Sequence, residues 1–335
     1  MNASTVSHLE TLYPQAAEPG ACLVAVRRGE IIHQECRGAA SLQDDTVLPV
    51  TLDTNFRLAS VAKQFTAACI LILRERKALT LATTLTDLFT GFPDYGRSIT
   101  IHHLLTHTSG LQDYEDLLPS NLTVPIMDAD VLEIMTRQRT TYFPPGDQFR
   151  YSNSGYALLA AAVEQMSGVS YPQFLRENVF DPLGMAGTLA YVNKPGLPDV
   201  PNRAFGYRKT ESGFELADQN MTSAVLGDGG IYCSPRNYLI WHKALREGAL
   251  LPASVVDETI TPALANDGQP IPYGLGWRLE THNGRHTPYH PGSTTGFNHC
   301  IRWVPSEDFL LLLFANRSGA GSRELARELE AKFLP

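Results

Sequence analysis

Strand-like segments at both ends of this 335-residue chain enclose a long middle region of helices and loops. We expect strands over 22–27 and 30–38, joined by a tight turn at Arg28-Gly29, and four more near 274–280, 285–289, 296–304 and 309–315. This order predicts an α/β (α+β) protein. One antiparallel sheet would be built from both termini and flanked by helices, with an all-helical domain inserted.

The same pattern divides the chain into two domains. We expect residues 1–76 plus 271–335 to form the sheet domain with its flanking helices, and residues 77–270 to form the inserted helical domain. Expected helices cover about 5–15, 156–167, 235–246 and 322–333, and a further one begins after Ser170. A cleft would lie at the junction of the two domains, where binding sites tend to be found.

Charge and composition narrow the class of function. The net charge is −8 and the basic residues are scattered, so we expect no nucleic-acid partner. No apolar run is long enough to span a membrane, and no signal peptide is recognisable, which predicts a cytoplasmic protein, or a periplasmic or secreted one if a signal was trimmed. The five cysteines show no Cys-x-x-Cys pairing and are expected to be buried thiols. We expect no metal and no cofactor, and the sequence predicts no oligomeric state.

The segment Ser60-Val61-Ala62-Lys63 places a nucleophile beside a base. Apolar residues recur at helical spacing from 59 to 76, so Ser60 and Lys63 share one face of a helix, about one turn apart. At a helix N-terminus, free backbone N–H groups favour an oxyanion nearby. The alternative is a helix-capping serine followed by a solvated lysine.

Two later motifs strengthen the catalytic interpretation. Tyr151-Ser152-Asn153 lies in the expected helical region, and His290-Pro291-Gly292 lies on a returning strand. Segments this far apart in the chain can meet the serine only at the junction of the two parts.

Several segments resemble the β-lactamase-related serine hydrolases, which include class C β-lactamases, penicillin-binding proteins, D-aminopeptidases and family VIII carboxylesterases. The resemblance covers 56–63, 101–111, 144–146 with 151–156, and 227–230. It implies the fold described above and an acyl-enzyme mechanism.

The resemblance also implies roles for individual residues. Ser60 is the nucleophile, Lys63 takes its proton, and Tyr151 relays protons to the leaving group. Asn153 steadies the lysine and a substrate amide. Each has a structural alternative: Tyr151 as a half-buried aromatic residue and Asn153 as a capping residue.

The third motif departs from the penicillin-recognising pattern, because His290-Pro291-Gly292-Ser293 stands where β-lactamases carry Lys-Thr-Gly-Ser or a close variant. Proline has no hydroxyl and no N–H, and histidine is mostly neutral at pH 7, so contacts to a substrate carboxylate are lost. The N–H of Ser293 is retained for an oxyanion hole, and Gly292 permits close approach of a substrate. A structural strand histidine is the alternative for His290.

We therefore expect a serine hydrolase that acts on a small ester, amide or peptide, of carboxylesterase or D-amino-acid peptidase type and weak on β-lactams. A true β-lactamase or DD-peptidase is one alternative, and a non-turnover acyl-binding or sensing protein is another. The segment 227–230 is expected to form a tight turn near the cleft, since no P-loop lysine follows it. His102, His103 and His107 are expected to be structural.

Overall fold

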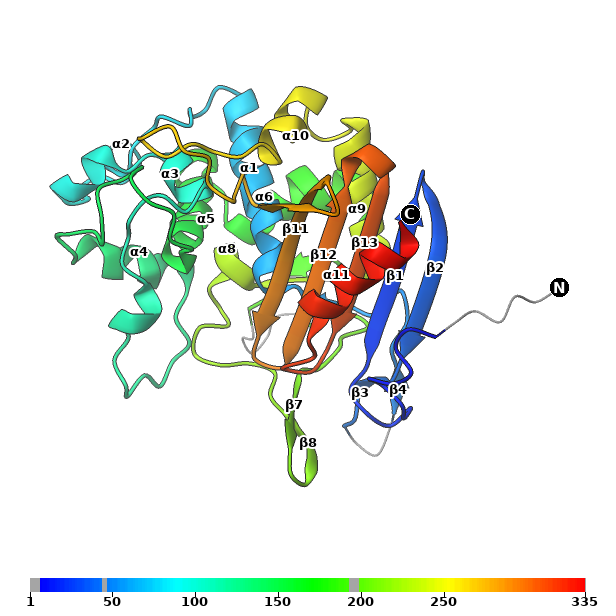
Figure 1. The fold of residues 1–335 in the computed structure, drawn as a ribbon. Helices are drawn as coiled ribbons and strands as arrows, with labels where there is room; N and C mark the ends of the chain where they lie inside the picture. Colours follow the sequence, from blue (N-terminus) through cyan, green and yellow to red (C-terminus); the bar gives the residue numbers. More distant parts are fainter. Residues whose placement is uncertain (1–6, 44–46, 193–198, 335) are drawn as a thin grey trace.

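A six-stranded antiparallel sheet forms one side of the molecule in a computed structural model that describes residues 7–43, 47–192 and 199–334 (Figure 1). The strand order is β10-β11-β12-β13-β1-β2. The bounds are β1 Ala21–Arg27, β2 Glu30–Arg37, β10 Arg278–His282, β11 Arg285–Thr294, β12 Phe297–Val304 and β13 Phe309–Ala315. The two ends of the chain therefore meet where β1 pairs with β13.

The central strand β13 shows why this sheet is covered on both faces. All seven of its residues, Phe-Leu-Leu-Leu-Leu-Phe-Ala, are buried. Successive side chains point to opposite faces of a strand, and Leu310, Leu312 and Phe314 join one hydrophobic cluster while Leu311 and Leu313 join another. The smaller cluster lies under α11 (Ser322–Phe333), which crosses one face of the sheet in Figure 1. The larger cluster joins the other face to the helices.

Helix α1 (Lys63–Glu75) lies at the centre of the larger cluster, and α5 (Asn153–Ser167) packs against it. Ser152 caps α5 by accepting the N–H of Gly155, and Gly168, with φ 75°, ends it. The other helices are α2 Leu85–Leu88, α3 Ile101–Leu105, α4 Asp128–Thr136, α6 Tyr171–Leu175, α7 Asp181–Leu183, α8 Leu226–Gly229, α9 Pro235–Glu247 and α10 Ala253–Thr259, with short 3-10 turns η1 Ala59–Ala62, η2 Asp94–Ser98, η3 Tyr114–Leu117 and η5 Pro305–Glu307 and a π-helical turn η4 Arg176–Phe180.

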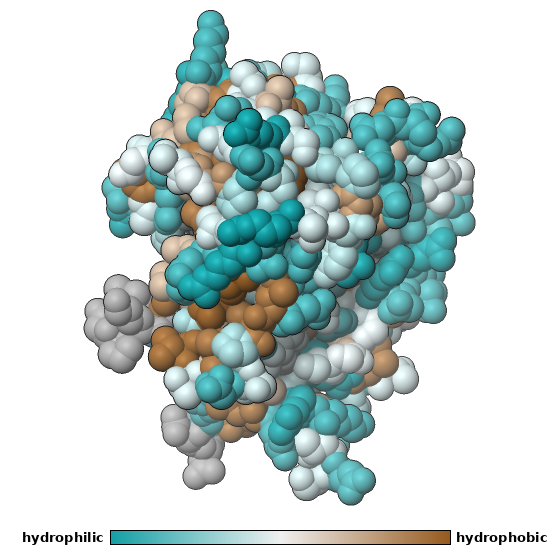
Figure 2. Space-filling view, turned by 90° about the vertical axis from the view of Figure 1, so that its left-hand side faces the viewer, coloured by the Kyte–Doolittle hydropathy of each residue, from teal (hydrophilic) through white to brown (hydrophobic). Residues whose placement is uncertain are grey.

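The face that carries α2 to α4 is mostly hydrophilic, with one contiguous hydrophobic area (Figure 2). Among the exposed apolar side chains of the chain are those of Val124, Met127 and Met221. Residues 124–127 are joined to the segment that carries Met221, because the N–H of Ile126 donates to the carbonyl of Met221.

None of the helices within the described ranges is long and apolar enough to cross a bilayer.

The predicted fold class is confirmed, with local differences. The middle region also contains short strands: β9 Ile231–Cys233 pairs with both β5 Phe56–Arg57 and β6 Leu189–Ala190, and β7 Tyr207–Thr210 pairs with β8 Gly213–Leu216. The insertion is therefore not purely helical. A further pair of short strands, β3 Ala39–Ser41 and β4 Leu48–Pro49, follows β2. The division into two domains stays a prediction.

The helix expected over 5–15 is wrong for residues 7–15, which form turns; residues 5 and 6 lie outside the described residues. The carboxylate of Glu35 on β2 accepts the backbone N–H groups of His8 and Leu9, which would lie in the first turn of such a helix. Leu9 and Tyr13 pack into the smaller hydrophobic cluster. Tertiary contacts thus hold the segment against the sheet in a non-helical form.

The cysteines differ in part from the expectation. All five are free thiols, but Cys36 is only half-buried. Cys22 and Cys36 are register partners on β1 and β2, with their Sγ atoms 2.8 Å apart. Strand pairing has brought together two residues that are separated in the sequence.

Candidate active site

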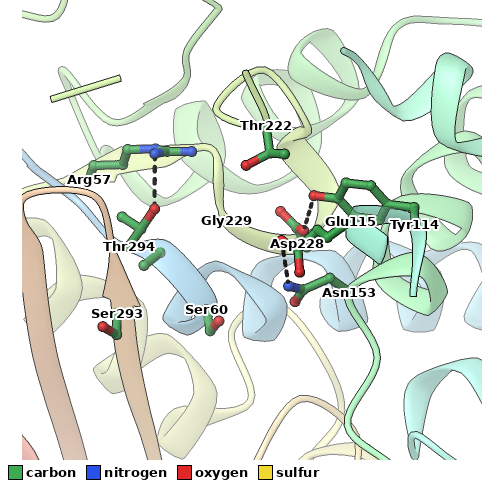
Figure 3. Close-up of a pocket in the computed structure, with 11 residues that line it drawn as sticks. Arg57, Ser60, Tyr114, Glu115, Asn153, Thr222, Asp228, Gly229, Ser293 and Thr294 are labelled. Carbon is green, nitrogen blue, oxygen red and sulfur yellow. Dashed lines mark hydrogen bonds between the residues drawn. The ribbon is translucent and has the colours of Figure 1, made fainter. Parts of the chain in front are cut away.

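Ser60 lies in the 3-10 turn η1, directly before α1 and after the short strand β5. The preceding residue, Ala59, has a φ of 50°, a left-handed conformation that is uncommon for a residue other than glycine. Such strain costs on the order of 1 kcal/mol and clusters at functional sites. Ser60 is half-buried and lines a cavity of about 70 Å³ (Figure 3).

Lys63 is fully buried at the start of α1, one turn after Ser60. Its Nζ donates to the Asn153 Oδ1 at 2.9 Å and to the backbone carbonyl of Asp228 at 2.8 Å. A longer contact of 3.4 Å joins it to the Ser60 Oγ. The amine is therefore fixed beside the serine hydroxyl by an amide from α5 and a carbonyl from α8.

Tyr151 comes immediately before the residue that caps α5. Its ring centroid is 5.0 Å from the Lys63 Nζ and 4.6 Å from the Arg278 Cζ. Its hydroxyl is buried and has no hydrogen-bond partner among the described residues. The phenol thus lies against the Lys63 amine and the Arg278 guanidinium, and its hydroxyl makes no hydrogen bond within the described residues.

Asn153 links the lysine to a carboxylate on the cavity wall. Its Oδ1 accepts from Lys63, and its Nδ2 donates to the Glu115 Oε1 at 3.3 Å. In Figure 3 the Asn153 side chain lies beside Asp228 and Glu115, across the cavity from Ser293.

The third predicted element lies on β11, but its residues are placed differently from one another. Ser293 is exposed and lines the cavity. Gly292 lies behind it, where an added Cβ would come within 2.4 Å of the carbonyl oxygen of Leu58. This glycine allows β11 to pack against the turn that carries Ser60.

His290 is fully buried and is not among the residues that line the cavity. Its Nε2 is 3.0 Å from the Tyr273 hydroxyl, and its Nδ1 is 2.8 Å from the carbonyl oxygen of Pro291. Burial, followed by the positive charges of Arg278 and Lys63, holds the pKa of His290 well below its ordinary value. A direct contact of His290 with a substrate remains a prediction.

The cavity also contains residues that sequence reasoning missed. Arg57 is buried and donates to the Ser223 and Thr294 hydroxyls, and Figure 3 shows it at one end of the cavity, away from the two acidic residues. Glu115 follows Tyr114 in η3. Tyr114 is buried, and its hydroxyl donates to the Asp228 Oδ2 at 3.2 Å. Arg57 and Asp228 lay in segments already singled out, 56–63 and 227–230, although neither residue was given a role. The second segment lies at the single turn α8 beside the cavity.

The two acidic residues are electrostatically coupled. Burial raises the pKa of Asp228, and the positive charges of Lys63 and Arg57 oppose that rise. Glu115 is an exposed residue, but its carboxyl is turned towards the cavity, where partial burial and the charge of Asp228 raise its pKa. This end of the cavity is suited to a cationic group of a substrate. Within the described residues, no group of three or more His, Cys, Asp or Glu side chains is placed to hold a metal ion.

Comparison with known proteins gives a consistent result. The model of the Beta-lactamase family matches residues 6–334. The chain is 29% identical to Penicillin-binding protein 4* of Bacillus subtilis, covering 93% of this chain and 72% of that protein. It is 27% identical to the D-aminopeptidase of Gluconobacter oxydans, covering 98% of this chain and 61% of that longer protein. The crystal structure of a penicillin-binding protein from Bacillus halodurans superposes with a TM-score of 0.82 and 28% identity, covering 98% of this chain and all of that one.

Proposed function

The chain belongs to the Beta-lactamase family and is an enzyme of its serine hydrolase type, and we propose that it cleaves the amide or ester bond of small amino-acid derivatives that carry a free ammonium group. The observation that supports this substrate class most is the position of Glu115. Its carboxylate borders the same cavity as Ser60 and is joined through Asn153 to Lys63. A substrate ammonium bound there would place the adjacent carbonyl near the serine.

The proposed reaction uses Ser60, Lys63, Tyr151 and the backbone of Ser293. Lys63, acting in its neutral form, accepts the proton of Ser60, and the serine Oγ bonds to the substrate carbonyl carbon. The backbone N–H groups of Ser60 and Ser293 stabilise the oxyanion. The carbon–nitrogen or carbon–oxygen bond breaks as the leaving group takes a proton through Tyr151. Water then attacks the acyl carbon, and Ser60 regains its proton.

The D-aminopeptidase relatives support a D-configured amino-acid residue on the acyl side. Because those relatives are much longer than this chain, their activity is carried over only as a proposal.

A substrate panel tests this proposal. D-alaninamide, L-alaninamide, N-acetyl-D-alaninamide, p-nitrophenyl acetate and benzylpenicillin would be compared by kcat/KM, with Ser60→Ala as the control. We expect D-alaninamide to have the highest kcat/KM of the amides. The N-acetylated amide should have a lower kcat/KM, because it has no ammonium group. Ser60→Ala should lower kcat at least about 10³-fold. A single burst without turnover on every substrate would favour the acyl-binding alternative. Faster turnover of benzylpenicillin than of every other substrate would favour a β-lactamase.

A further inference from the structure

His107 lies directly behind Tyr151, shortly after α3. It is fully buried, and its φ of 58° places it among the few residues other than glycine with a left-handed backbone. Its carbonyl oxygen accepts the N–H of Arg150 at 2.9 Å. Asparagine, aspartate and histidine are the side chains that tolerate this conformation best, so the backbone itself restricts what can stand here.

The imidazole makes two contacts with the segment that carries the second motif. Its Nδ1 accepts the backbone N–H of Ser152 at 3.0 Å, and its ring lies 4.2 Å from the ring of Tyr151 at an angle of 35°. Ser152 stands between Tyr151 and Asn153, the two residues that face Lys63. One side chain therefore fixes the peptide that separates them.

The ring is neutral in this position. Because Nδ1 is an acceptor, the single proton of the neutral ring lies on Nε2, which is buried without a partner among the described residues. Burial, followed by the charges of nearby basic groups, holds the pKa of His107 well below its ordinary value. The titratable groups around it are Lys63, Arg278, His290, Tyr151, Tyr156 and Tyr273.

We propose that His107 is a positioning residue, whose neutral Nδ1 holds residues 151–153 so that Tyr151 and Asn153 face Lys63. This inference rests on the proposed function, because it assumes that Tyr151 and Lys63 handle the protons of Ser60. A protonated ring would lose the acceptor for Ser152 and add a positive charge beside Lys63. The geometry thus requires the uncharged ring that the surroundings favour.

Two amide substitutions separate the acceptor from the bulk of the side chain. In His107→Asn the Oδ1 takes the place of Nδ1, and asparagine also tolerates the left-handed backbone. In His107→Gln the acceptor lies one bond farther out, nearer the place of Nε2. We expect His107→Asn to retain kcat within about fivefold and His107→Gln to lose about 100-fold, the cost of a misplacement near 1 Å. KM should change less than kcat in both variants.

A double-mutant cycle tests whether His107 acts through Tyr151. The decrease in kcat caused by His107→Gln should shrink to a few-fold in a Tyr151→Phe background, because the effects of substitutions in residues that act as a unit are not additive. His242 is the matched control, since it is also buried with an unpartnered Nε2 but packs against Trp303, away from the cavity. His242→Gln should lower the melting temperature and leave kcat within about twofold.

Several outcomes would overturn the inference. Equal activity of the two His107 variants would show that the acceptor is irrelevant, and an additive cycle would show that His107 does not act through Tyr151. Losses that follow the melting temperatures, with His242→Gln as impaired as His107→Gln, would show a purely structural role. Labelling of Ser60 by a fluorophosphonate separates these failures from a failure of the acyl-enzyme mechanism on which the proposed function depends, which would leave Ser60 unlabelled in the unaltered protein.

Discussion

Replacing Gly292 with alanine tests whether the contact between β11 and the Ser60 turn sets the geometry of the site. The added Cβ would lie 2.4 Å from the carbonyl oxygen of Leu58 and 3.2 Å from the Val61 Cγ2. The first distance is about 1 Å shorter than an ordinary van der Waals contact. Both neighbours flank Ser60, and a backbone oxygen cannot rotate away. The strand and the turn must therefore move apart by several tenths of an ångström or more.

The magnitude follows from that displacement. Overpacking of this kind costs about 1–3 kcal/mol of unfolding free energy. A misplacement near 1 Å between Ser60 and Ser293 costs about 100-fold in kcat/KM. We expect Gly292→Ala to show both losses. Urea unfolding would measure the first, and hydrolysis of the best substrate of the panel would measure the second.

Gly155→Ala is the matched control. Gly155 is a buried helical glycine in α5, and its nearest neighbour to an added Cβ is the Leu104 carbonyl oxygen at 3.4 Å, an ordinary contact. Alanine also favours a helix over glycine by roughly 0.5–1 kcal/mol. We expect stability to hold or rise and kcat/KM to stay within about threefold. If Gly292→Ala behaves like this control, the packing of β11 against the turn does not set the geometry of the site.

Three further predictions concern the chemistry. Lys63→Ala and Tyr151→Phe should each lower kcat nearly as much as the double mutant does, because the two residues act as one proton-handling unit. Additive losses in kcat, measured from steady-state rates, would refute that. The raised pKa of Glu115 means that its carboxylate is present above that pKa, so KM for alaninamide should rise as pH falls through it. Glu115→Gln should raise KM and flatten this pH dependence, and an unchanged profile would exclude an ammonium site. Benzylpenicillin should acylate Ser60 about one to two orders of magnitude more slowly than it acylates a β-lactamase that binds the penicillin carboxylate. The reason is that Pro291 cannot donate to that carboxylate, and a charge-assisted contact contributes about 1.5–3 kcal/mol. Stopped-flow measurement of the acylation rate would check this.

The sequence could predict the sheet and the local motifs for physical reasons. The apolar run of β13 needs cover on both faces, and the spacing of Ser60 and Lys63 is a property of one helical turn. The turns over residues 7–15 could not be predicted, because the segment is held against the sheet by contacts with a distant residue, the Glu35 carboxylate that accepts the N–H groups of His8 and Leu9. Periodicity alone carries no information about such long-range contacts.

The composition of the cavity was also beyond the sequence. Glu115 stands in ordinary surroundings in the sequence, and Arg57 lies in the Ser60 segment without any sign of a role. Only the fold shows that both side chains line the same cavity as Ser60. The motif position of His290 predicts a substrate contact, which stays a prediction, whereas the buried contact of its ring with Tyr273 could not be read from the sequence. Motif spacing indicates which strand reaches the site, whereas side-chain direction depends on packing.

The most direct measurement is the mass of the protein and of its peptides after reaction with a fluorophosphonate probe. We expect one adduct per chain, located on Ser60, and no adduct in Ser60→Ala. Labelling should also slow markedly in Lys63→Ala, because the amine beside the hydroxyl takes its proton. An adduct on another serine, or labelling that persists unchanged in Ser60→Ala, would contradict the claim that Ser60 is the nucleophile of this hydrolase.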